Sequence, residues 1–127
     1  MTRLTLSFAI LLQAGLPSFA QADPLSEGRR MAEMFFRGET GTIWTASTPE
    51  MQQAFGSQDN LATIREDVSD AFGTEEQILS ERVENRAGHD VFTRISRWSN
   101  APAPLEMVIA FDEAERIAGF FIRQQPV

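Results

Sequence analysis

The sequence contains no cysteine, no lysine and no tyrosine, and its only histidine is His89. Without cysteine, the chain can form no disulfide, no thiolate nucleophile and no Cys-ligated metal site. Without lysine, it can form no Schiff base and has no phosphate-loop lysine. The absence of cysteine also removes the residue that would carry the acyl group of a lipoprotein, so we expect no membrane anchor.

Positive charge is also scarce. The chain has 18 acidic and 11 basic residues, which gives a formal net charge of −7. Nucleic acids and anionic membrane surfaces attract clustered positive charge, so we expect neither as a partner. An acidic surface is what an ordinary soluble protein uses to stay in solution.

The first 22 residues have the pattern of a secretory signal peptide. Arg3 supplies a positive start, residues 4–12 are an almost unbroken apolar run, and Ala20 and Ala22 place small residues at a signal-peptidase site. The run is too short to span a membrane. We therefore predict a leader over residues 1–22 and a soluble periplasmic or secreted protein. Residues 23–127 suffice for a single domain with one core.

Three helices and one further helical turn are expected next. The helices cover residues 27–37, 49–55 and 57–72, and the turn covers residues 42–46. Ser26, Thr48 and either Ser57 or Asp59 are the expected N-caps, because short polar side chains accept hydrogen bonds from the first backbone N–H groups. The longest helix carries a clear apolar stripe at three- and four-residue steps, made of Leu61, Ile64, Val68 and Phe72.

After Gly73 the apolar period changes from 3.6 to about 2, which predicts strands. They cover residues 77–86, 90–98, 105–111 and 116–123, joined by short turns. Leu79 and Val83 are expected on one face of the first strand and Ile78 on the other. Helices followed by hairpin-connected strands predict an α+β fold, with three helices packed on one face of a four-stranded antiparallel meander.

The order of these elements resembles the NTF2-like or cystatin-like cone. Within it, four segments resemble the uncharacterised DUF3887-like domains that occur alone or ahead of exported serine hydrolases: residues 48–51 (TPEM), 72–73 (FG), 108–112 (VIAFD) and 116–122 (RIAGFFI). The resemblance covers nearly all of the chain from about Leu25 onward. It implies the fold but no catalytic residue, because in fused relatives the catalytic serine belongs to the following domain.

Four residues are candidates for a ligand pocket or its rim: Trp44, Phe92, Arg94 and Trp98. Arg94 shares a strand face with Phe92, Ser96 and Trp98. If that face lies under the helices, a buried guanidinium requires an acidic partner or an anionic ligand. If it faces outward, Arg94 stacks on Trp98 at the surface. We favour the outward or rim position, because an uncompensated buried charge is costly.

No motif of a nucleophilic, nucleotide-binding or zinc enzyme is present, so we expect no cofactor, no metal site and no assignable catalytic residue. His89 is the only histidine, a residue type often used as a general acid or base, but it lies in an expected hairpin turn. Asp112, with Glu113 and Glu115, lacks the spacing of a calcium loop and is better explained as an acidic turn.

These observations favour an exported non-catalytic module that binds a small molecule or an envelope protein. A homodimer through the sheet would suit the last strand, which is apolar on both faces. The alternative is a small NTF2-like enzyme, of the isomerase or dehydratase type, with an inward acid–base pair. The alternative requires an acidic residue or histidine inside an enclosed apolar cavity; the candidates are Asp67, His89, Asp90 and Glu106.

Overall fold

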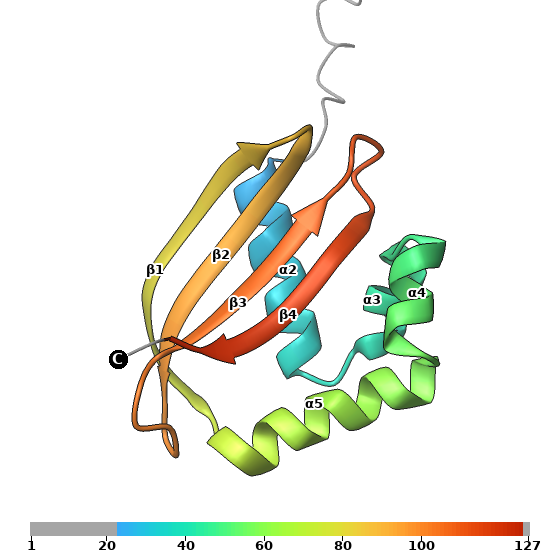
Figure 1. Cartoon of the computed structure of the whole chain (residues 1–127). Coiled ribbons are helices and arrows are strands. Elements are labelled where there is room, and N and C mark those ends of the chain that lie inside the picture. The colour runs from blue at the N-terminus through green and yellow to red at the C-terminus, as the bar shows by residue number, and fades with distance from the viewer. Residues whose placement is uncertain (1–22, 126–127) are drawn as a thin grey trace, which may run out of the picture.

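The computed structural model describes residues 23–125, so the predicted signal peptide lies outside the described residues. In this part of the chain, helices precede strands (Figure 1). The helices are α2 (Pro24–Phe36), α3 (Thr40–Ala46), α4 (Pro49–Phe55) and α5 (Gln58–Phe72). The strands are β1 (Glu75–Arg86), β2 (His89–Trp98), β3 (Leu105–Phe111) and β4 (Ile117–Gln124). The α+β fold class is confirmed, but the described residues hold four helices, because the expected turn at 42–46 is a helix.

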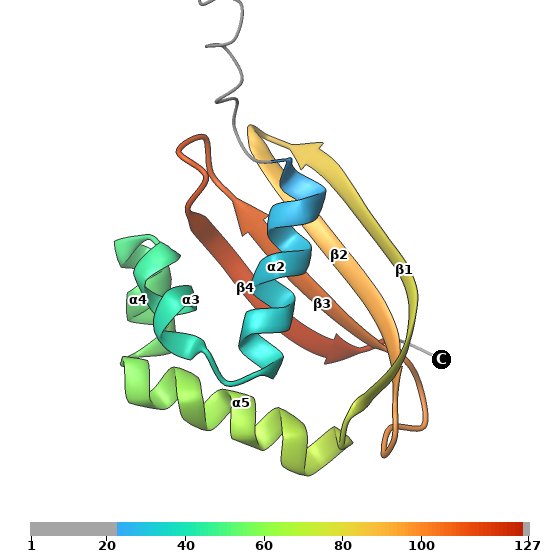
Figure 2. The same ribbon diagram turned by 180° about the vertical axis from the view of Figure 1, so that it is seen from behind.

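The strands form one antiparallel sheet in the order β1-β2-β3-β4. Helix α2 lies across one face of this sheet, which we call the inner face, and α5 runs across one end of it (Figure 2). The short helices α3 and α4 lie beside β4. Within residues 23–125, no helix is long and apolar enough to cross a membrane.

The helix starts follow capping rules, with one correction. Thr48 caps α4 through a hydrogen bond from Met51 N–H to Oγ1 at 3.1 Å, and Ser57 caps α5 through Asn60 N–H at 3.0 Å. The predicted cap Ser26 is wrong. Asp23 takes that position and accepts the Ser26 N–H, because Pro24 is preorganised for the first helical turn and moves the start three residues upstream.

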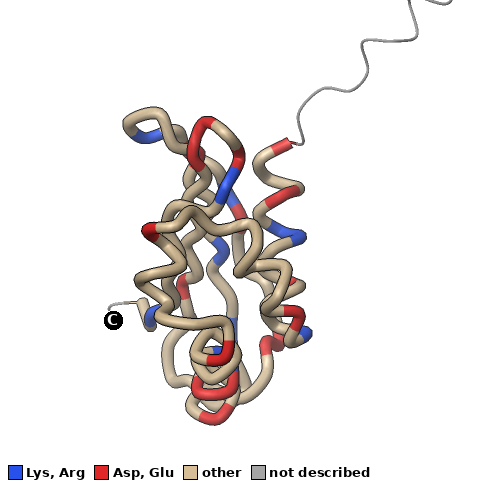
Figure 3. Tube along the Cα trace, turned by 90° about the vertical axis from the view of Figure 1, so that its right-hand side faces the viewer, with Lys and Arg blue, Asp and Glu red and all other residues tan. Residues whose placement is uncertain are grey.

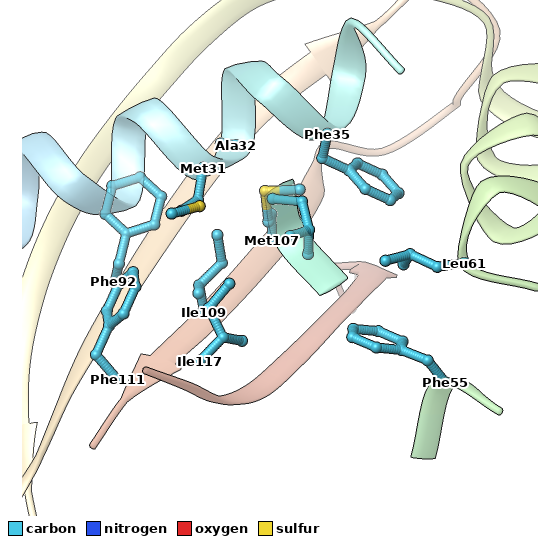
Figure 4. Close-up of a cluster of buried hydrophobic side chains, with 11 residues drawn as sticks. Met31, Ala32, Phe35, Phe55, Leu61, Phe92, Met107, Ile109, Phe111 and Ile117 are labelled. Atoms are coloured by element: carbon cyan, nitrogen blue, oxygen red, sulfur yellow. The ribbon is translucent and has the colours of Figure 1, made fainter. Parts of the chain in front are cut away.

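The core lies between α2 and the inner face (Figure 4). Met31, Ala32 and Phe35 of α2 are buried against the sheet. Gly28 lets the helix approach β2, because a Cβ at this position would overlap the ring of Phe92. Burying each large apolar side chain contributes roughly 1.5–3 kcal/mol. The remaining buried members of the cluster are Ile43, Phe55, Leu61, Met107, Ile109, Phe111 and Ile117.

Two register shifts interrupt β1. They lie between Glu75 and Gln77 and between Ile78 and Ser80. Directly paired residues of an antiparallel sheet point to the same face. Ile78 pairs with Ser96, and Val83 pairs with Phe92, so both lie on the inner face. The expectation that Ile78 faces away from Val83 is therefore wrong, because a bulge changes the alternation by one residue.

The free edge of β4 has a partner at its start. Ser47 forms an isolated parallel bridge with Ile117, and the Thr48 N–H donates to the Ile117 carbonyl at 2.9 Å. The junction of α3 and α4 is thereby tied to the first residue of β4.

Candidate functional site

Arg94 lies in the interior. Its side chain is 3% exposed, on the inner face beneath α2. Nε donates to Glu75 Oε2 at 3.0 Å and Nη2 donates to Glu75 Oε1 at 2.5 Å, which makes a bidentate pair. The favoured outward position is therefore wrong, and the alternative of a buried guanidinium with an acidic partner is confirmed. Charge-assisted bidentate pairing compensates much of the desolvation that burial imposes.

A second carboxylate extends the pair into a chain of four charges. Glu81 Oε2 lies 3.4 Å from Arg94 Nη1, and Glu81 Oε1 accepts from Arg29 Nε of α2 at 2.9 Å. The hydrogen bond to Glu81 raises the pKa of Arg29 above its ordinary value, so this guanidinium stays charged. Two positive and two negative groups balance one another, and they connect α2 to both β1 and β2.

Aromatic rings adjoin this ionic chain. The Arg94 guanidinium carbon lies 6.0 Å from the centroid of the Phe36 ring. Phe36 and Trp98 meet edge to face, with centroids 5.0 Å apart and planes at 69°. The indole Nε1–H of Trp98 donates to Ser96 Oγ at 3.1 Å, so its one polar group is satisfied within the protein. Trp98 therefore presents an apolar surface to its surroundings.

A cavity of about 240 Å³ opens beside these rings, between α5, the end of α2, the start of β1 and the end of β2. Phe36, Trp98 and Val68 form its apolar walls. Its remaining lining residues are Arg65, Ser69, Gly73, Thr74 and Glu75. We call this cavity the α5 pocket.

The strand connections hold the α5 pocket in shape. Thr74 N–H donates to Ser99 Oγ at 3.0 Å, and Ser99 N–H donates to the Thr74 carbonyl at 2.9 Å. Asn100 N–H donates to the Phe72 carbonyl at 2.9 Å. Gly73 has φ +81°, and a Cβ there would clash with Ser99, so only glycine fits this junction. Backbone bonds thus fix the end of α5 against the turn after β2.

The four candidate pocket residues are separated by the fold. Trp98 lines the α5 pocket. Arg94 does not line it but binds Glu75, which does. Phe92 is fully buried in the core under Gly28. Trp44 lines a different, open depression beside Pro49 and Gln52. The structure thus groups Trp98 with Arg94 and places Phe92 and Trp44 elsewhere.

None of the four acid–base candidates points into an enclosed apolar cavity. Asp67 is exposed on α5, and Glu106 lies on the outer face, where Arg123 binds it at 2.8 Å. Asp90 accepts from Asn85 at the β1–β2 hairpin. His89 lies in the turn, with Nδ1 3.3 Å from the Ala87 carbonyl.

Asp112 forms the acidic turn expected from the sequence. Its Oδ1 accepts from the backbone N–H groups of Ala114 and Arg116, both at 2.9 Å. The bond from Arg116 N–H, with that from Ala114, holds the pKa of Asp112 below its ordinary value. Among residues 23–125, no group of three or more acidic or histidine side chains could hold a metal ion.

Sequence reasoning missed the two inward carboxylates, Glu75 and Glu81. A signal existed for Glu81: a two-residue turn at Ala87 and Gly88 pairs residue 86 with 89 and therefore 81 with 94. No such signal existed for Glu75, because two bulges separate it from the regular part of the ladder.

No protein family, no curated protein and no solved structure matches this chain.

Proposed function

We propose that the protein is an exported, non-catalytic module that binds a small molecule in the α5 pocket. The observation that carries this proposal is the pocket itself, a cavity with two aromatic walls whose adjoining buried charges are already paired. Small-molecule sites are typically concave and apolar with a few fixed polar groups. Membership of the NTF2-like or cystatin-like group, and of its DUF3887-like branch, is part of the same proposal and rests on the order of the elements and the segments quoted above.

The enzymatic alternative has weaker support. Glu75 is an acidic residue at the pocket wall, as an isomerase or dehydratase of this shape would need. Both of its oxygens, however, accept hydrogen bonds from Arg94, so the carboxylate already serves to hold that buried guanidinium. His89, one of the four candidates named from the sequence, lies at the end of β2 opposite to Trp98 and the α5 pocket.

Binding in the α5 pocket is tested by filling it. Ser69 lines the pocket, and its neighbour Asp70 on α5 is exposed. We would screen a mixture of small neutral and charged aromatic fragments by ligand-observed NMR against the natural chain, Ser69→Phe and Asp70→Phe. The proposal predicts fragment signals that Ser69→Phe removes and Asp70→Phe retains. Fragment binding that survives Ser69→Phe would place the site elsewhere.

Export is tested separately. When the full chain is expressed in a Gram-negative host, the mature protein should accumulate in the periplasm or medium with Asp23 as its first residue. N-terminal sequencing of that material decides the point. Retention of Met1 in the cytoplasm would contradict both the leader and the localisation.

The outer face of the sheet is a candidate surface for a second kind of partner, either an envelope protein or another copy of this chain. Phe121 is 45% exposed on this face, and Val108 is its cross-strand neighbour. The Arg123 guanidinium lies 5.2 Å from the Phe121 ring centroid and covers part of it. A homodimer through this surface would dissociate on Phe121→Glu, and light scattering coupled to size exclusion measures the change. A natural chain that is monomeric at high concentration would exclude the homodimer.

A further inference from the structure

The α5 pocket contains one positive charge without a carboxylate partner among the described residues. Arg65 Nη2 donates to the Phe36 carbonyl at 2.6 Å, and this is its only hydrogen bond within residues 23–125. A guanidinium has five N–H donors in a planar fork. The bond fixes Arg65, which lines the pocket, against the end of α2 and leaves its other N–H donors without a protein acceptor among the described residues.

The other charges of the pocket wall cancel. Glu75 is the acidic residue that lines the cavity, and both of its oxygens are bonded to Arg94. Glu81 offsets the charge of Arg29 behind it. Acidic residues also occur along α5 (red in Figure 3). Those nearest Arg65 in the helix are all exposed to water: Glu66, Asp67 and Asp70. The side of the pocket that faces a ligand is therefore positive at Arg65.

The shape of the pocket limits the size of the ligand. Its volume of about 240 Å³ is below the roughly 300–1,000 Å³ of drug-sized sites. Phe36, Trp98 and Val68 leave an apolar space between the rings and α5, and the hydroxyls of Ser69 and Thr74 line the same cavity. A ligand that fits must be compact, apolar over most of its surface and able to accept hydrogen bonds at one end.

We infer that the ligand is a small apolar monocarboxylic acid, of the aromatic or branched aliphatic kind. Its apolar part would lie against Trp98, Phe36 and Val68, and its carboxylate would bind Arg65 with help from Ser69 or Thr74. A cationic ligand is disfavoured, because Arg65 repels it and Glu75 is already occupied by Arg94. This inference rests on the proposed function and names the class of molecule that the same pocket takes.

The composition of the chain provides a direct assay. The protein has two tryptophans and no tyrosine, so Trp44→Phe leaves Trp98 as its only strong fluorophore. Phenylacetate, phenylacetamide and phenethylamine differ in charge but little in shape. We expect phenylacetate to perturb Trp98 fluorescence with an affinity at least about tenfold higher than the amide, since a hydrogen bond to a charged group exceeds a neutral one by this order.

Variants of Arg65 locate the effect. Arg65→Gln should abolish the preference for the acid over the amide, and Arg65→Lys should retain part of it. Arg82→Gln, on the outer face of β1, is the matched control and should change nothing. Circular dichroism and urea unfolding establish that each variant is folded. If Arg65→Gln fails to fold, the comparison of acid with amide in the unchanged chain still decides the ligand class.

The outcomes separate this inference from the proposed function. Equal affinities for phenylacetate and phenylacetamide would contradict the inference that the ligand is a carboxylic acid bound by Arg65. So would a folded Arg65→Gln variant that keeps the preference for the acid. If none of the three compounds binds while other fragments bind in a manner sensitive to Ser69→Phe, the ligand class is wrong and the pocket stands. If nothing binds in either experiment, both the inference and the proposed function fail.

Discussion

The inner face of the sheet is divided into two chemically different halves. On β3 and β4 it is apolar, with Met107, Ile109 and Ile117 buried in the core. On β1 and β2 it carries Glu75, Glu81 and Arg94 beside the apolar Phe92 and Val83, and the α5 pocket lies at the end of this half. Apolar packing supplies most of the stability of a fold, whereas buried ion pairs contribute little net free energy against apolar replacements. The division therefore separates the part that holds the domain together from the part that shapes a site.

The largest effect is expected from the apolar half. Phe35 is fully buried between α2 and the sheet, and its ring centroid lies 5.1 Å from that of Phe120. Phe35→Ala should lower the free energy of unfolding by about 3–5 kcal/mol, because a large cavity remains. Urea denaturation measures the change. A loss below about 1 kcal/mol would show that this half does not dominate stability.

A smaller effect is expected from the charged half. Arg94→Met leaves Glu75 and Glu81 without their shared partner and should cost about 2–4 kcal/mol, less than for fully buried pairs because both carboxylates are partly exposed. Adding Glu75→Gln should restore roughly half of the loss, since Glu75 is the carboxylate left unpaired, whereas Glu81 keeps its pair with Arg29.

Arg123 provides the matched exposed arginine. It binds Glu106 at 2.8 Å with its side chain largely in solvent, so Arg123→Met should change stability by less than about 1 kcal/mol. If Arg94→Met and Arg123→Met lowered the free energy of unfolding equally, the buried arginine would contribute no more to stability than the exposed one.

The smallest effect is expected at the β3–β4 turn, outside both halves. Asp112→Ala removes two hydrogen bonds and should cost about 1 kcal/mol at pH 7. Because the folded state lowers the pKa of Asp112, its contribution is complete above the ordinary pKa of the carboxyl. It is lost as pH falls through the lowered folded-state value.

Unfolding free energies of the natural chain, Asp112→Ala and Asp112→Asn between pH 7 and pH 2 test this sign. Asn keeps the acceptor oxygen and loses the charge, so its difference from the natural chain should close in acid. A difference that is independent of pH would contradict a role for the carboxylate charge.

Most of the fold could be predicted from the sequence, because its elements obey local rules. The third strand, residues 105–111, matches the structure, since regular alternation from Leu105 to Phe111 leaves no other period. Thr48 is confirmed as a cap, and of the two candidates Ser57 and Asp59 it is Ser57 that caps α5. The start of α2 was missed because Ser26 and Asp23 are both competent caps, and Pro24 decides between them.

The site could be predicted less well, because it depends on register and on contacts between distant segments. Arg94 was correctly placed on one face with Trp98. The hairpin turn gives a signal for its partner Glu81, but no local signal reveals Glu75, which forms the bidentate pair. The apolar stripe of the longest helix gives no signal for Arg65. Its position in the pocket follows from how α5 meets the end of α2, 29 residues earlier.

The short bridge between Ser47 and Ile117 bears on how the domain avoids aggregation. An open edge strand invites other chains to add to the sheet, and proteins often blunt such edges with lysine. This chain has no lysine, and instead its own backbone occupies the start of β4 through the Thr48 N–H. The same threonine begins α4 with its hydroxyl, so the residue that starts a helix also occupies the first position of this sheet edge.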